Sequence, residues 1–126
     1  MINQDAVEAF NTRITANLNN IKTMTASQLD AVKDHGSQAE ALLKNKQLAM
    51  FIHQFKFELC DQLASINGYT AEDNNKRIAI SNQIGGIDSF ISTLQRAVYL
   101  KNRVVTQQQE GPATEPIDGL QREYSV

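Results

Sequence analysis

The side chains in this sequence that could do chemistry lie close together near the middle of the chain. His53, Glu58, Cys60 and Asp61 fall in one short stretch. A metal site on one helix takes ligands three or four residues apart, whereas His53 lies five residues before Glu58 and seven before Cys60. Acidic neighbours disfavour the thiolate that a nucleophilic cysteine needs. We therefore expect no catalytic residue, no metal and no cofactor, and we predict that the protein is not an enzyme.

Other patterns for catalysis or phosphate binding are also incomplete. His35 stands beside Gly36 in a predicted turn, which is typical of an exposed loop histidine. Gly85-Gly86 is not a phosphate-binding loop, because no lysine follows it and no strand precedes it. Lys76, Arg77 and Arg96 could hold a small anionic ligand, and this is the weakest of the functional hypotheses.

The composition sets the class of protein. The chain has 126 residues, 41% of them hydrophobic, with one cysteine, no tryptophan and a net charge of −2. These values exclude a disulfide scaffold and disfavour nucleic acid as a partner. No apolar run reaches the ~18 residues of a membrane span, and the first residues do not resemble a signal peptide. We expect a cytoplasmic protein with no membrane contact, with incorporation into a particle left open.

The positions of the helix breakers predict an all-α fold. Both prolines, Pro112 and Pro116, lie near the C-terminus, so the preceding chain lacks the strongest helix breaker. We expect a first break at 34–37, where Gly36 ends a helix and Ser37 begins a capping box. A second is expected at 66–70, where Gly68 is left-handed and Thr70 is the N-cap.

These breaks predict an antiparallel three-helix bundle with helices at about 4–34, 37–67 and 70–105. A competing break at 23–27, with Ser27 as the N-cap, would divide the first helix. We expect residues 1–105 to form the bundle and residues 106–126 to form a non-helical tail, because the composition changes at Thr106.

Residues 70–105 have the clearest apolar pattern. Aliphatic side chains recur there at alternating spacings of four and three, which predicts a heptad seam for helix packing. Lys101 weakens the seam near its end. The candidate interface residues of this seam are Ile80, Ile84, Ile87, Ile91, Leu94 and Val98.

The middle helix is apolar on more than one side. One stripe contains Leu48, Ile52, Phe55, Leu59 and Ile66, widened by Phe51 and Leu63, and a second contains Met50, Phe57, Cys60 and Ala64. Such a helix needs at least two neighbours. They are either the other helices of the bundle or a second subunit. We take Phe51 and Phe55 as further interface candidates.

Gly85-Gly86 and the tail each leave alternatives open. Two glycines inside a helix cost about 2 kcal/mol relative to alanines. They indicate a close helix crossing, a kink, or a hinge or contact point for a partner helix. The tail either docks on another chain, folds back or is disordered. Its candidate anchors are Ile117, Leu120, Tyr124 and Val126.

Two hypotheses of function follow. The first is a non-enzymatic helical assembly protein that associates with itself, as a subunit of a larger particle such as a virion or a secretion machine. The second is a small helical chaperone, inhibitor or adaptor that binds one target protein in an interhelical groove. Both name a protein as the partner.

Overall fold

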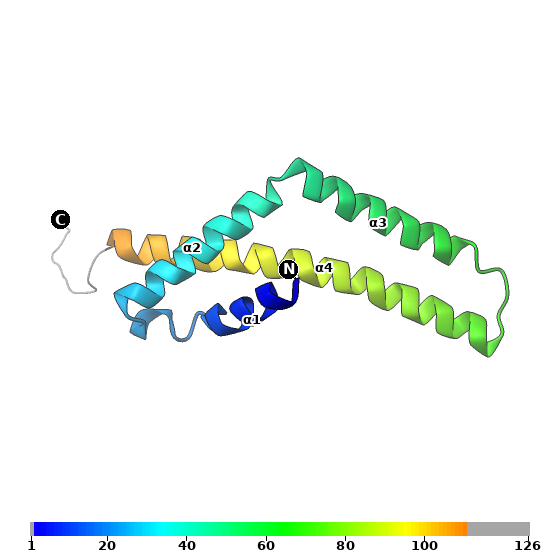
Figure 1. Cartoon of the computed structure of the whole chain (residues 1–126), viewed down its shortest axis with the longest axis horizontal. Coiled ribbons are helices and arrows are strands. Elements are labelled where there is room, and N and C mark those ends of the chain that lie inside the picture. Colours follow the sequence, from blue (N-terminus) through cyan, green and yellow to red (C-terminus); the bar gives the residue numbers. More distant parts are fainter. Residues whose placement is uncertain (1, 111–126) are drawn as a thin grey trace, which may run out of the picture. The chain divides into compact units, whose positions relative to one another are not determined.

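The computed structural model describes residues 2–110, and this part of the chain is helical with no strand. The all-α prediction is confirmed, but four α-helices replace the three expected. They are α1 (Ile2–Thr12), α2 (Ala26–Leu43), α3 (Lys46–Ala64) and α4 (Ala71–Glu110), with a 3₁₀ turn η1 (Ile21–Thr23) between α1 and α2 (Figure 1). Helix α4 continues to Glu110, past the predicted end at 105, and the rest of the tail lies outside the described residues.

The described chain divides into two compact units. Unit 1 comprises residues 2–35 and 99–110, and unit 2 comprises residues 36–98. Helices α2 and α4 therefore contribute residues to both. Unit 2 also contains the whole of α3, which is joined to the start of α4 by a short connection.

The first predicted helix, 4–34, is wrong, because the chain leaves the helical path after Thr12. Two asparagines in the following loop supply its hydrogen bonds. Oδ1 of Asn17 accepts from the backbone N–H groups of Asn19 (2.8 Å) and Asn20 (3.1 Å), and Oδ1 of Asn20 accepts from the N–H of Asn17 (2.9 Å). Asparagine side chains compete in this way with backbone helix bonds. These side-chain hydrogen bonds therefore stabilise a loop in place of the predicted helix.

Helix α2 begins at the competing break, but its cap is Thr25 and not Ser27. The N–H of Gln28 donates to Oγ1 of Thr25 (3.2 Å), and the N–H of Thr25 donates to Oε1 of Gln28 (2.9 Å). This reciprocal pair is a capping box.

The predicted break at 34–37 is also wrong, because α2 runs through it without interruption. Gly36 and Ala39 are buried, and Ala39 packs with Leu94 and Ala97 of α4. The small size of these two residues lets α2 pack closely, and Gly36 does not form the predicted turn. The break lies instead at Asn45, whose Oδ1 accepts a 2.8 Å hydrogen bond from the N–H of Leu48 at the start of α3.

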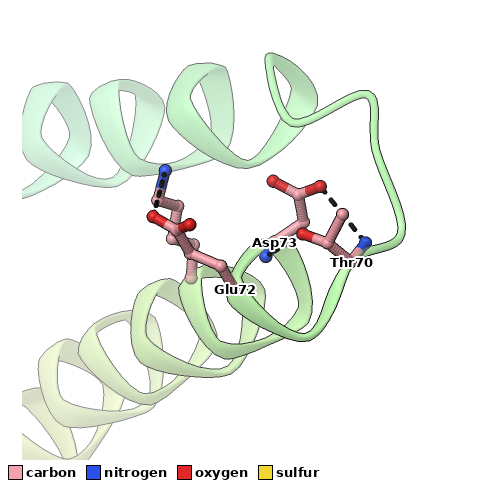
Figure 2. A network of polar contacts seen from close by, with 4 residues as sticks. Thr70, Glu72 and Asp73 are labelled. Carbon is pink, nitrogen blue, oxygen red and sulfur yellow. Dashed lines mark hydrogen bonds and ion pairs between the residues drawn. The ribbon is translucent and has the colours of Figure 1, made fainter.

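The predicted start of α4 is confirmed. Oγ1 of Thr70 accepts from the N–H of Asp73 (3.1 Å), and Oδ2 of Asp73 accepts from the N–H of Thr70 (3.3 Å), as Figure 2 shows. The hydrogen bonds from Thr70 lower the pKa of Asp73 below its usual 3.8. Gly68 does not have the predicted left-handed conformation. A Cβ at Gly68 would displace the carboxylate of Asp73, whose Oδ2 accepts the hydrogen bond from Thr70.

Each unit has a small aliphatic core. In unit 1 it consists of Ala16, Ile21, Val32, Leu100 and Val104, of which Val104 is completely buried. The buried hydrophobic residues of unit 2 are Ala39, Leu59, Ile80, Leu94 and Ala97. No aromatic side chain belongs to either core.

Candidate functional site

The largest apolar side chains of this protein lie on its surface. The sequence contains five phenylalanines, and all five are exposed. Four of them belong to unit 2: Phe51 (73% exposed), Phe55 (46%), Phe57 (67%) and Phe90 (47%). Phenylalanine is among the residues most often buried in folded proteins. An interaction surface in unit 2 is therefore the candidate functional site.

Three of these phenylalanines line an open groove between α3 and α4, which we call the aromatic groove. Its volume is about 620 Å³. The lining residues of α4 are spaced three and four apart and so share one helix face. The groove is lined by Phe51, Ile52 and Phe55 of α3 and by Gln83, Gly86, Ile87 and Phe90 of α4. Gln83 is the one polar side chain among them.

An ion pair links α3 and α4, and each of these helices also has a buried aliphatic side chain in unit 2. Leu59 of α3 and Ile80 of α4 are 1% and 9% exposed. Nζ of Lys56 lies 2.9 Å from Oδ1 of Asp88, so this ion pair links the two helices. Both side chains are partly exposed, and such pairs contribute about 0–1 kcal/mol. We infer that the ion pair adds little stability and helps to set which residues of α3 and α4 lie side by side.

The glycine pair is open to solvent. Apart from the flanking residues and the backbone of α4 itself, no described atom lies within 4 Å of the position that a Cβ would take at Gly85 or Gly86. A close helix crossing within the described chain is therefore wrong as an explanation of these glycines. Gly86 lines the aromatic groove, and a kink, a hinge and a contact point for a partner helix stay as predictions.

A second apolar surface lies on the other side of α3, and we call it the α3 stripe. It consists of Met50, Phe57, Cys60 and Ala64, all of which are exposed. A helix turns by about 100° per residue, so Phe55 and Phe57 point to opposite sides of α3. The four residues of the second predicted stripe are thus exposed, and the exposed His53 and Asp61 lie on the same side of α3.

The predicted interface residues separate into three groups. Ile80 and Leu94 are buried, while Ile84, Ile87, Ile91 and Val98 are half-buried, so most of the predicted seam is turned toward the interior of the chain. Phe51 and Phe55 are exposed and line the groove. Ile117, Leu120, Tyr124 and Val126 lie outside the described residues.

Sequence reasoning missed Phe90 and Gly86 as a pair on one rim of the groove. The signal was present, because Phe90 follows Gly86 by four residues and therefore lies on the same face of α4. The face was not recognised because both residues lie outside the heptad seam.

The residues considered for chemistry do not form a site in the described chain. Within residues 2–110, no group of three or more His, Cys, Asp or Glu side chains could hold a metal ion. His35 is exposed but lies within α2 and not in the predicted loop. Arg77 belongs to α4 and is hydrogen-bonded to the connection that precedes this helix. Its guanidinium donates to the carbonyls of Ile66 (3.2 Å) and Gly68 (2.5 Å).

Comparisons of this chain with protein-family models, with curated proteins and with solved structures found no match. Among the helices of residues 2–110, none is long and apolar enough to cross a membrane. The aromatic groove is the candidate interaction surface of the described residues.

Proposed function

We propose that this protein is a non-enzymatic helical subunit that associates with copies of itself through the exposed aromatic side chains of unit 2. The observation that carries the proposal is the exposure of every phenylalanine in the chain. The two cores are built from smaller aliphatic side chains. Because the single chain leaves about half or more of each phenylalanine uncovered, this aromatic surface is available for contacts with another chain.

The energetics support association as the use of this surface. Complete burial of a phenylalanine side chain contributes roughly 1.5–3 kcal/mol. Aromatic residues, phenylalanine among them, are enriched at protein–protein interfaces relative to the rest of the surface. Phe51, Phe55 and Phe90 surround one groove. They therefore form a group of anchors and not scattered exposed residues.

The second hypothesis, an adaptor that holds a helix of a target protein, is supported by the same groove. The two hypotheses differ in the behaviour of the purified protein. A self-associating subunit forms oligomers whose population rises with protein concentration. An adaptor remains a monomer until its target is present.

The test is light scattering coupled to gel filtration, on full-length protein over a wide range of concentrations. The variants are the double substitution Phe51→Ser with Phe90→Ser, and the single substitutions Phe51→Ser and Phe10→Ser. Phe10 is 64% exposed and belongs to unit 1, so Phe10→Ser is the matched control for Phe51→Ser, whose phenylalanine is 73% exposed.

We expect oligomers for the wild type and for Phe10→Ser, a smaller population of oligomers for Phe51→Ser, and monomers for the double variant. Helicity measured by circular dichroism should be the same for all four proteins. A wild type that stays monomeric at every concentration would overturn self-association and favour the adaptor. Oligomers of unchanged size in the double variant would remove the groove from the proposal.

A further inference from the structure

The connection between α3 and α4 contains a reactive dipeptide, Asn67-Gly68. Asn67 is the one asparagine of the sequence that is followed by glycine. It is exposed, and it lies after the end of α3 at Ala64 and before the start of α4 at Ala71. The side-chain amide of an asparagine can react with the next backbone nitrogen. Glycine obstructs that approach least, because it has no side chain and a permissive backbone.

The two groups that would react with each other are not held by hydrogen bonds. In the part of the chain that the structure describes, neither the side-chain amide of Asn67 nor the N–H of Gly68 has a hydrogen-bond partner. Other asparagines outside the helices do use their side chains. Oδ1 of Asn17 and Oδ1 of Asn20 accept from backbone N–H groups of their loop, and Oδ1 of Asn45 caps α3. Asn67 is thus both followed by glycine and unrestrained at its side chain.

We propose that Asn67 is a site of spontaneous deamidation and that Arg77 sets its rate. In the first step, the backbone nitrogen of Gly68 attacks Cγ of Asn67. A bond forms between these two atoms, the bond from Cγ to Nδ2 breaks, and ammonia leaves with the proton that the Gly68 nitrogen loses. In the second step, water opens the resulting succinimide ring at either carbonyl, which gives aspartate or isoaspartate. Water is the one co-reactant of the sequence.

One nitrogen of Arg77 binds the backbone on both sides of Asn67. Nη2 donates to the carbonyl of Ile66 (3.2 Å) and to the carbonyl of Gly68 (2.5 Å). Nη1 donates to Oδ1 of Asn74 (2.8 Å), so a residue of α4 also holds the guanidinium. Ring closure needs the two reacting atoms aligned at ~3–3.5 Å, which demands a particular backbone rotation at Asn67. The hydrogen bonds on either side limit that rotation and should slow the reaction.

The isoaspartate product changes the path of the backbone. Its peptide bond runs through the former side-chain carbon, so one extra carbon atom separates the carbonyls of Ile66 and Gly68. We therefore expect Nη2 of Arg77 to lose one of these two acceptors. Both products also add a carboxylate beside the cap of α4, because Asn67 and Asp73 line the same cavity. Like charges at close range disfavour each other, so the start of α4 should open more often in the converted chain.

The test follows ammonia loss from full-length protein held at neutral pH and physiological temperature. Peptide mass spectrometry locates each converted residue, and chromatography separates peptides that contain aspartate from those that contain isoaspartate. Asn67 should be converted faster than Asn75, which is the internal reference because it is exposed and lies within α4. Asn67→Gln should abolish ammonia loss at this position, since the longer side chain would have to close a larger ring.

Substitutions of Arg77 test its control of the rate. Arg77→Gln removes the hydrogen bonds to the connection and should raise the rate at Asn67 several-fold. Arg77→Lys keeps the positive charge and should also raise it, because lysine lacks the second nitrogen that attaches the guanidinium to Asn74. Arg96→Gln is the matched control, since Arg96 is an exposed arginine further along α4. Circular dichroism shows which variants are folded, and Arg77→Lys decides if Arg77→Gln is not.

The rates separate the two parts of the proposal. Conversion of Asn67 no faster than that of Asn75, in the wild type and in both Arg77 variants, would overturn the site. Fast conversion of Asn67 at the same rate in the wild type and the Arg77 variants would overturn the role of Arg77. A rise in Arg96→Gln equal to that in Arg77→Gln would do the same.

Hydrogen exchange tests the effect of the extra backbone atom. The isoaspartate form, purified by ion exchange, should exchange its amides in the first turns of α4 faster than the wild type does. Asn67→Asp has the same added charge without the extra carbon, so it should show a smaller increase. Equal exchange in the two proteins would overturn the loss of the Arg77 contacts. None of these readouts depends on self-association, so they leave the proposed function to its own test.

Discussion

Unit 1 and unit 2 both leave large apolar side chains exposed, and they differ in that unit 2 gathers three phenylalanines around one groove. Unit 1 buries Ile21, Val32 and Val104 to 3% exposure or less in one cluster. Unit 2 buries Leu59 to 1% but leaves four phenylalanines exposed on α3 and α4. The cores of both units consist of aliphatic side chains. Stability and association should therefore depend on different residues, and substitutions can separate them.

The largest expected effect on stability is that of Leu59→Ala in the core of unit 2. Removing a buried leucine side chain costs roughly 2–5 kcal/mol, because the transfer energy is lost and a cavity remains. Chemical denaturation at low protein concentration measures this loss. Phe57→Ala on the same helix is the control, with an expected change within about 0.5 kcal/mol. Equal losses for the two variants would contradict the division between core and association residues.

The helix caps allow the two units to be compared directly. Thr70→Ala in unit 2 and Thr25→Ala in unit 1 each remove one capping hydrogen bond, so each should cost about 1 kcal/mol of unfolding free energy. Denaturant midpoints of both variants measure the losses. Ser27→Ala is the control, because Ser27 was an expected cap that the structure does not use. A larger loss for Ser27→Ala than for Thr25→Ala would contradict the position of the α2 cap.

The two central glycines should separate stability from association within one helix. Gly85→Ala and Gly86→Ala should each stabilise α4 by about 0.5–1 kcal/mol, because alanine has the higher helix propensity and no described atom opposes its Cβ. Gly86 lines the groove and Gly85 does not. Gly86→Ala alone should therefore weaken self-association in light scattering. Equal weakening by Gly85→Ala would contradict a close approach at Gly86.

The smallest effect concerns pH. The folded state lowers the pKa of Asp73, so the α4 cap stabilises the protein above pH 3.8 and loses this contribution as the pH falls through the folded-state value. The cap of α2 uses Gln28, which does not titrate in this range. The difference in denaturant midpoint between wild type and Asp73→Ala should shrink as the pH falls. The difference for Gln28→Ala should stay constant.

The all-helical class and the position of α4 could be predicted from the sequence, because their signals are local. The aliphatic residues of α4 recur with a regular period, and Thr70 and Asp73 have the spacing of a capping box. The same local reasoning predicted a helix start at Ser37 that is wrong, although Ser37 and Glu40 also have the spacing of a capping box. Burial of Gly36 and Ala39 in α2 overrides that signal, and burial depends on residues far away in the sequence.

The candidate site was predictable in part for the same reason. Phe51 and Phe55 were predicted as interface residues from the width of the apolar face of α3. The role of α4 in the groove was missed, because the pairing of α3 with α4 decides which residues line it. The Lys56–Asp88 contact joins residues 32 positions apart, and no local pattern indicates it.

The connection between α3 and α4 depends on a side chain that comes after it in the sequence. Arg77 donates to the carbonyls of Ile66 and Gly68, and its guanidinium lies 4.8 Å from the centre of the Tyr69 ring. Arg77 belongs to the second turn of α4, so these contacts require that turn to be formed. Order in the connection is therefore coupled to the second turn of α4, and fraying of that turn would release the connection as well.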